Sequence, residues 1–399
     1  MPYWRLSGFY LFYFASLGAL VPYWSLYLKA NGFSARDIGM LMAVIMATKI
    51  VSPNVWGWIA DHTGQRMRIV RIGCLLAVIS FTGVFFQESW QDDLQHRFWW
   101  LALVMLLFSF FWNAALPQFE ATTFNHLGQE SHRYSTIRLW GSIGFIISVA
   151  ILGPLLDRQG ADILPWVLTG LFGCIWFASL VVPEQSAHHQ VLKHEPLRQV
   201  LQRPAVLALL AVCFFMQMSH GPYYTFYTIY MEDHGYSRSL IGQLWALGVI
   251  AEVVVFMFMQ RWLPRFGLRR LLMLSLALAS VRWLMIGWCV DILPLMVIAQ
   301  VLHAASFGLY HASAIQLIHR YFTGRHQGIG QALYSSISFG AGGAIGSLYS
   351  GNSWDSLGAS MTFSIASGIS LIAFFIGWRW IRPAAEERQQ TPVISPAIK

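Results

Sequence analysis

Twelve stretches of about twenty apolar residues follow one another along this chain, each long enough to cross the hydrocarbon core of a membrane. They are residues 6–28, 38–60, 69–87, 98–120, 135–156, 163–183, 205–230, 239–260, 271–290, 293–318, 327–350 and 357–380. Only 11% of the 399 residues are charged and 56% are hydrophobic, so charged residues cannot cover a soluble surface of this size. The sequence predicts an all-α membrane protein with twelve transmembrane helices and excludes a soluble enzyme.

Basic residues are distributed unevenly between the connections on the two sides. The side that includes both termini holds 18 Lys and Arg and 6 Asp and Glu, whereas the other side holds 5 and 10. Cytoplasmic loops of membrane proteins carry an excess of Lys and Arg. We therefore expect a multi-pass protein of the inner (plasma) membrane with both termini in the cytoplasm. Because this bias accounts for the net charge of +8, no nucleic-acid partner is expected.

The two halves of the sequence are related by an internal repeat. A shift of 203 residues aligns identical residues, among them Gly32 with Gly235, Ser34 with Ser237, Gly39 with Gly242 and Gly64 with Gly267. The shift passes over six spans, an even number, so both repeats have the same orientation. Such a parallel duplication is typical of transporters that carry a substrate site between two bundles.

The repeat and a polar stretch near the midpoint predict the domain organisation. We expect a six-helix bundle at 1–183, a cytoplasmic linker at 184–204 and a second six-helix bundle at 205–382. A cytoplasmic tail is expected at 383–399. This two-bundle arrangement favours alternating access over a channel or a membrane enzyme.

The connection after the second span combines Gly57, Asp61, Gly64, Arg66 and Arg68. This pattern resembles the cytoplasmic signature of the major facilitator superfamily. The resemblance implies the major facilitator fold and a latch that holds one conformation. A loop that is only positive-inside would explain Arg66 and Arg68, but not Asp61 or the glycines.

Further stretches resemble the phenylpropionate permease group of that superfamily, itself similar to lactose permease and the nucleoside symporters. They are residues 21–29, 138–145, 220–224, 235–252, 281–283 and 302–304. This resemblance implies proton-coupled symport of a small aromatic carboxylate such as 3-phenylpropionate. A sugar or nucleoside proton symporter is the alternative, and drug efflux or a non-transporting scaffold is less favoured.

Five of the formally charged residues inside the predicted spans are candidate site residues: Lys49, Glu120, Arg138, Glu252 and Arg282. An ionisable group in a bilayer costs several kcal/mol or more and usually faces a cavity or a partner. Glu120 and Arg138 lie on neighbouring spans, and the resemblance to lactose permease implies a role in substrate binding. A purely structural ion pair is the alternative. Arg138 is suited to a carboxylate because guanidinium binds it with two parallel hydrogen bonds.

Glu252 lies in the middle of its span, so we expect it to be paired or protonated and to be a candidate proton carrier. Lys49 is its counterpart under the 203-residue shift and either anchors the substrate or neutralises a nearby dipole. Arg282 and His303 resemble the coupling network of lactose permease. Ser306 stands where that network has an acidic residue, which leaves Glu252 or Glu120 as the proton carrier.

Histidines and aromatic residues complete the expected substrate site. They are Tyr23, Trp24, His220, Tyr224, Tyr227, His303 and His311. Aromatic side chains can stack on an aromatic substrate, although such residues also form the belts at membrane interfaces. The alternative for the histidines is a hydrogen-bonded structural role.

No pattern of an enzyme, a cofactor site or a metal site is recognisable. The four cysteines lie apart in apolar spans without metal-ligand spacing, as expected for small core residues. We therefore expect a monomeric transporter whose partners are the lipid bilayer, protons and a small organic anion.

Overall fold

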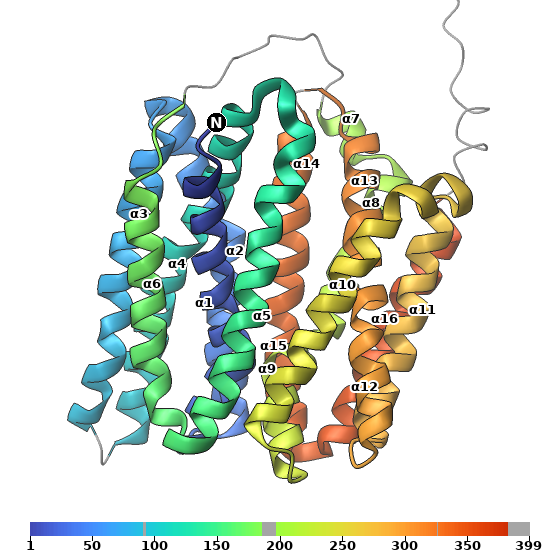
Figure 1. The fold of residues 1–399 in the computed structure, drawn as a ribbon. Helices are drawn as coiled ribbons and strands as arrows, with labels where there is room; N and C mark the ends of the chain where they lie inside the picture. The colour runs from blue at the N-terminus through green and yellow to red at the C-terminus, as the bar shows by residue number, and fades with distance from the viewer. Residues whose placement is uncertain (91–92, 186–196, 325, 382–399) are drawn as a thin grey trace, which may run out of the picture.

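The computed structural model describes residues 1–90, 93–185, 197–324 and 326–381, and every secondary-structure element in these ranges is helical (Figure 1). The first part contains α1 (Tyr3–Ala30), α2 (Ala35–Thr63), α3 (Arg66–Phe81), η1 (Thr82–Trp90), α4 (Leu94–Leu127), η2 (Gly128–Arg133), α5 (Tyr134–Gln159), η3 (Ala161–Ile163) and α6 (Leu164–Leu180). The second part contains α7 (Leu197–Leu201), α8 (Pro204–Ser219), α9 (Gly221–Asp233), α10 (Arg238–Phe266), α11 (Leu268–Trp288), α12 (Leu293–Val301), η4 (Ala304–Leu309), α13 (Tyr310–Tyr321), α14 (His326–Ser335), η5 (Ser336–Gly342), α15 (Gly343–Leu357) and α16 (Ala359–Trp380). Most of the predicted linker and the predicted tail 383–399 lie outside the described residues, while α7 lies at the linker's end.

In the described ranges, eleven helical runs are long and apolar enough to cross a membrane, and they correspond to eleven predicted spans. The remaining predicted span, 327–350, is also helical and lies in the run α14–η5–α15. Its many glycines and serines make it less apolar than the others. This run packs against α2, α8, α9 and α16. Much of it therefore faces protein, and fewer of its side chains have to be apolar for contact with lipid.

Residues aligned by the repeat shape equivalent turns in the two halves. Gly32 and Gly235 have φ values of +86° and +82°, a backbone conformation that favours glycine. Ser34 and Ser237 each cap the following helix by accepting a hydrogen bond from a backbone N–H. The predicted duplication is therefore reproduced in the local geometry of α2 and α10.

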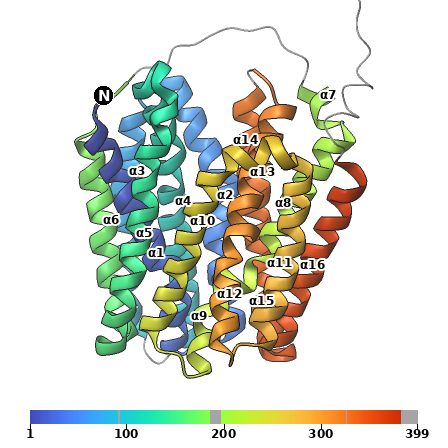
Figure 2. The same cartoon turned by 45° about the vertical axis from the view of Figure 1, so that its right-hand side comes forward.

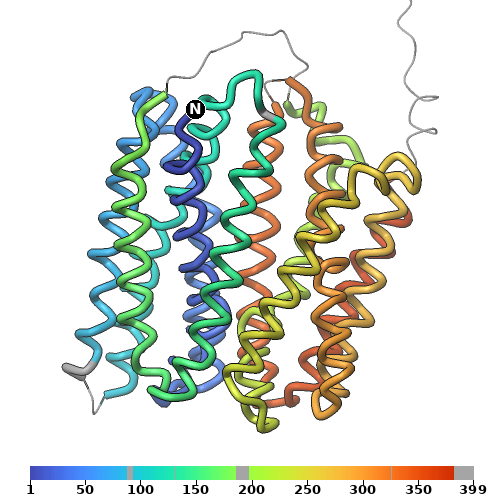
Figure 3. Tube along the Cα trace, viewed as in Figure 1, coloured from blue at the N-terminus to red at the C-terminus, as the bar shows by residue number. Residues whose placement is uncertain are grey.

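We refer to the helices α1–α6 of the first half of the chain as the first group and to α8–α16 as the second group. In Figures 1 and 2 the helices of the two groups lie side by side. The groups contact each other through α2 with α15, α5 with α10, and α1 with α9. The trace in Figure 3 places the N-terminus and the end of α16 at the same end of the molecule, which we call the terminal end.

Four of the predicted spans are not regular α-helices throughout. The third, 69–87, ends in the 3₁₀-helix η1, which begins at Thr82. The seventh is interrupted at His220, directly before the sequence Gly221-Pro222 that begins α9. The tenth and eleventh contain the π-helical turns η4 and η5. Such π-turns occur mostly as local insertions in α-helices and frequently at functional sites.

Candidate functional site

The two groups of helices are fastened together at the end opposite the terminal end. Asp157, near the end of α5, accepts hydrogen bonds from the backbone N–H groups of Arg238 and Ser239, each at 2.9 Å. These N–H groups have no partner within their own helix because they belong to the first turn of α10, and a carboxylate there also interacts favourably with the helix dipole. Lys29 and Asp233 add an ion pair between the groups at the same end.

Glycines allow the helices to cross closely near this end. A Cβ atom on Gly39 would lie 2.7 Å from the Cα of Gly351, and one on Gly242 would lie 2.4 Å from the carbonyl oxygen of Val149. Any side chain at Gly39 or Gly242 would therefore force the groups apart. Away from these crossings, α5 and α10 diverge toward the terminal end (Figures 1 and 2).

In the first group, Glu120 and Arg138 lie with the aromatic residues Tyr134 and Phe14. The Tyr134 hydroxyl donates a hydrogen bond of 3.1 Å to Glu120, and the Arg138 guanidinium lies 3.6 Å from the centre of the Phe14 ring. Among the described residues no ion pair within 4.0 Å joins Glu120 to Arg138. A tyrosine hydrogen bond and a cation–π contact thus stand in place of the structural ion pair that was the alternative for these two residues.

In the second group, the carboxylate of Glu252 lies 3.7 Å from Nε2 of His303, and the Glu252 side chain is 16% exposed. Arg282 is fully buried. Its Nε donates to the carbonyl of Ala299 at 2.8 Å, and one terminal nitrogen donates to the Ser306 hydroxyl at 3.1 Å. Ser306, which replaces an expected acidic residue, therefore binds Arg282 without neutralising it.

The expected site residues His303 and His311 form a stack of rings with Phe307 along the tenth span. The rings of His303 and Phe307 are 5.4 Å apart and those of Phe307 and His311 are 5.8 Å apart, with interplanar angles of 3° and 0°. His311 also contacts the Tyr334 hydroxyl at 2.8 Å. His220 lies nearby, with its ring 6.3 Å from Phe307. Phe307 was not among the expected site residues, although its i, i+4 spacing to both histidines was visible.

The remaining expected binding residues are more dispersed. The Tyr23 hydroxyl donates to the carbonyl of Val149 at 3.2 Å, and Trp24 packs against Phe81 of α3 with ring centres 5.6 Å apart. Both contacts lie within the first group, so these two rings take part in helix packing. Of the other expected residues, Tyr224 stacks on His220, Tyr227 contacts Trp245, and Nζ of Lys49 lies 3.5 Å from the sulfur of Met46.

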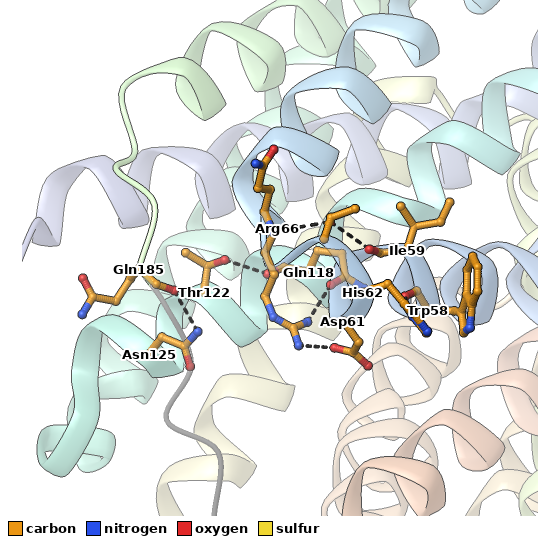
Figure 4. A network of polar contacts seen from close by, with 11 residues as sticks. Trp58, Ile59, Asp61, His62, Arg66, Gln118, Thr122, Asn125 and Gln185 are labelled. Carbon is orange, nitrogen blue, oxygen red and sulfur yellow. Dashed lines mark hydrogen bonds and ion pairs between the residues drawn. The ribbon is translucent and has the colours of Figure 1, made fainter.

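The expected latch residues form a polar network at the terminal end of the first group (Figure 4). Arg66 donates to Asp61 at 2.5 Å and to the side-chain oxygen of Gln118 at 2.8 Å. Gly64 has a φ of +69° and ends α2, which explains the glycine at this turn. Among the residues that the structure describes, Arg68 donates a side-chain hydrogen bond to Gln65 alone, so it lies beside the network without bridging helices.

Two features of this network had no recognisable signal in the sequence. A Cβ on Gly57 would make only ordinary contact, 3.5 Å from the Gln118 amide nitrogen, and Gln118 connects α4 to α3 by accepting a hydrogen bond from Arg66. Residues that follow α6 also belong to this network. Glu184 accepts a hydrogen bond from the backbone N–H of Met67 at 2.9 Å, and Asn125 donates one to the carbonyl of Gln185 at 3.1 Å.

Comparison with known proteins identifies the family of this chain. The model described as "MFS_1 like family" matches residues 3–365 of the chain. The chain belongs to this family of major facilitator transporters. It is therefore a multi-pass membrane transporter and not an enzyme.

Individual relatives of this MFS_1 like transporter differ in the substrates that their names give. It is 28% identical over 381 residues to the "Probable 3-phenylpropionic acid transporter" of Escherichia coli, covering 94% of this chain and 96% of the relative. It is 24% identical over 389 residues to the "Maltose permease" of Geobacillus stearothermophilus, covering 95% of each.

Solved structures confirm the fold of the transporter. A D-xylose–proton symporter matches with a TM-score of 0.72 at 12% identity, covering 95% of this chain and 97% of that one. The nucleoside transporter NupG matches with a TM-score of 0.74 at 16% identity, covering 96% and 100%. The predicted all-α major facilitator fold is thus confirmed.

The substitution Asp157→Ala in this transporter should weaken the closure opposite the terminal end. A capping side chain contributes about 1 kcal/mol, so the ratio of closed to open molecules should fall about fivefold. Spin labels at exposed positions 159 and 234 would report this as a longer distance by electron paramagnetic resonance. Asp162→Ala is the control, because Asp162 forms no hydrogen bond to α10 in the described part of the chain. Equal distances in both variants would contradict the capping role.

The substitution Arg66→Lys should destabilise the latch network. Lys presents a single charged nitrogen and cannot reproduce the fork that contacts both Asp61 and Gln118. We expect a loss of about 1 kcal/mol, because Asp61 is largely exposed and its ion pair is screened. Thermal unfolding of the purified transporter measures the effect. Arg68→Lys, which affects only the contact to Gln65, should cost less.

Proposed function

We propose that this transporter is a proton symporter of a small aromatic carboxylate and that it works by alternating access between its two helix groups. The observation that best supports this proposal is the arrangement of charged residues inside the spans. Among the described residues, Arg138 and Arg282 have no carboxylate within 4.0 Å, while Glu120 and Glu252 contact the uncharged or titratable partners Tyr134 and His303. This leaves positive charge available for an organic anion.

Each polar group has a role in this proposal. Arg138, with Lys49, holds the substrate carboxylate through charge-assisted hydrogen bonds. The ring of the substrate stacks on aromatic residues such as Tyr224 beside His220. Glu252 or Glu120 takes up the proton that allows the loaded protein to reorient, with His303 and Arg282 assisting. The name of the Escherichia coli relative supports an aromatic acid.

The conformational parts of the proposal follow from the contacts at the two ends. The ion pair between the latch residues Asp61 and Arg66 keeps the helices of the first group together. The two groups of helices close against each other alternately at the Asp157 end and at the terminal end. We propose that both termini are cytoplasmic in the inner membrane, in line with the Lys and Arg bias, and that a monomer suffices. The division into bundles 1–183 and 205–382 is part of the same proposal.

Sugar or nucleoside symport is the second candidate. It is supported by the maltose permease relative and by the structural match to a nucleoside transporter. Sugars and nucleosides carry no carboxylate, so they would use hydrogen bonds of Arg138 and Glu120 to hydroxyl groups rather than a charge pair.

Uptake of labelled 3-phenylpropionate into proteoliposomes tests the proposal directly. We expect accumulation with an inward proton gradient and none when the gradient is collapsed. Glu252→Gln or Glu120→Gln should abolish accumulation but retain exchange of substrate across the membrane, because a neutral amide mimics only the protonated carboxyl. If both variants accumulate substrate normally, the coupling role is wrong. Accumulation of a sugar or nucleoside instead would favour the second candidate.

Arg138→Lys tests the substrate-binding role. Loss of one charge-assisted hydrogen bond, worth about 1.5 kcal/mol, should raise the Kd for 3-phenylpropionate about tenfold. Equilibrium binding to the purified protein measures this. Arg158→Lys, at an exposed position near the end of α5, is the control and should bind as the wild type does. An unchanged Kd in Arg138→Lys would remove Arg138 from the site.

A further inference from the structure

The contact between Glu252 and His303 is framed by two glycines. A Cβ atom on Gly308 would lie 2.9 Å from Cγ of Glu252, and one on Gly248 would lie 3.4 Å from Cδ2 of His303. Gly308 is close in sequence to His303, and Gly248 is close in sequence to Glu252. Each partner of the contact thus lies over a glycine that belongs to the other partner's helix.

Backbone conformation does not explain these two glycines. The described glycines with positive φ are Gly32, Gly64, Gly128, Gly160, Gly235, Gly267, Gly324 and Gly358. Gly248 and Gly308 lie instead inside helical segments, where glycine is less favourable than alanine by about 1 kcal/mol. The space taken by the Cγ of Glu252 is therefore the reason for glycine at Gly308, whereas a Cβ on Gly248 would make ordinary contact with His303.

The π-turn η4 contributes to this arrangement. Gly308 follows His303 by five residues, and η4 covers Ala304–Leu309. One α-helical turn spans about 3.6 residues, whereas a π-turn closes a hydrogen bond over five. The wider turn allows both His303 and Gly308 to face α10, which η4 contacts.

We propose that Gly308, with Gly248, positions Glu252 against His303 and so sets the pH at which Glu252 exchanges its proton. The inference rests on the proposed proton coupling through Glu252. The surrounding charged and titratable groups on the packed elements are His303 beside η4, Arg138 on α5, Tyr223 and Tyr224 on α9, and, behind His303, Arg282 and His220. A displaced Glu252 would meet a different balance of these groups.

A double-mutant cycle tests the spatial part of the inference without transport. Gly308→Ala places a methyl group against Cγ of Glu252, and overpacking of this kind is destabilising. We expect the melting temperature of the purified protein to fall by about 2 °C or more. In a Glu252→Ala background the same substitution should cost much less, because Cγ is gone. Equal losses in the two backgrounds would overturn the inference.

Failure to fold would also be informative. If Gly308→Ala alone does not fold, the double variant Glu252→Ala with Gly308→Ala should fold as Glu252→Ala does. A double variant that also fails to fold, while Glu252→Ala folds, would show that another contact requires Gly308 and would overturn the inference.

The pH dependence of uptake tests the positioning role. We expect the pH of half-maximal uptake in Gly308→Ala, where it folds, to shift by about half a unit or more, which corresponds to a modest change in the surroundings of the carboxyl. Gly248→Ala should shift it less, because its methyl group would be less crowded. The matched control is Gly287→Ala, since a Cβ there lies 2.8 Å from Cβ of Phe363 and crowds the same group of helices elsewhere.

The outcomes separate this inference from the proposed function. A wild-type protein whose uptake does not depend on a proton gradient refutes the coupling proposal, and the cycle still reports whether Glu252 requires Gly308. If the wild type is proton-driven, a Gly308→Ala profile equal to that of the wild type, or equal to a shifted Gly287→Ala profile, refutes the positioning role.

Discussion

A charge inside a bilayer must be compensated by its protein surroundings, because lipid supplies neither water nor counter-ions. This chain meets that requirement mainly with neutral groups. Arg282 is held by a carbonyl, a hydroxyl and aromatic rings, and Arg138 by the face of Phe14. Glu120 has a tyrosine hydroxyl and Glu252 an imidazole. Neutral partners reduce the cost of burial and leave each formal charge available for a ligand or a proton.

Access to these charges depends on how the two groups of helices meet. Gly39 and Gly242 occupy equivalent places in the repeat, and both lie where backbones cross closely. At both crossings the backbone of one group approaches the backbone of the other, because glycine leaves no side chain between the helices. The hydrogen bonds from α10 to Asp157 add a directional contact that depends on a single carboxylate. Close backbone packing and this carboxylate together hold the two groups in contact at the end opposite the terminal end.

The sequence predicted the fold well because its signals are local. Apolar length predicts a span, serine at a turn favours the start of a helix, as at Ser34, and glycine favours its end, as at Gly64. The charged residues inside the spans were also recognisable one by one. Their partners were not, because a transmembrane helix is apolar both where it faces lipid and where it faces protein. Trp24, for example, packs toward α3, and periodicity alone could not distinguish that direction from the site.

Contacts between distant helices account for what the sequence did not reveal. Gln118 and Glu184 join the latch network only because α4 and the chain after α6 pass beside α3. Tyr134 was not among the expected site residues, and its hydrogen bond to Glu120 depends on how α4 and α5 meet. Gly308 gives no signal of its own among the 33 glycines of the chain. Its meaning depends on Glu252, which lies more than fifty residues away in sequence.

The two halves share a backbone plan but differ in their chemistry, and this difference bears on how coupling could arise. The first group places Lys49 and Arg138 on its inner helices, whereas the second places Glu252 beside His303. Under the proposed function, with Glu252 as the proton carrier, one half binds the carboxylate of the anion and the other binds the proton. Neither ligand alone would then satisfy both halves. Moving an uncompensated charge through the membrane interior is costly. The two groups of helices are therefore expected to reorient only when both ligands are bound or when neither is.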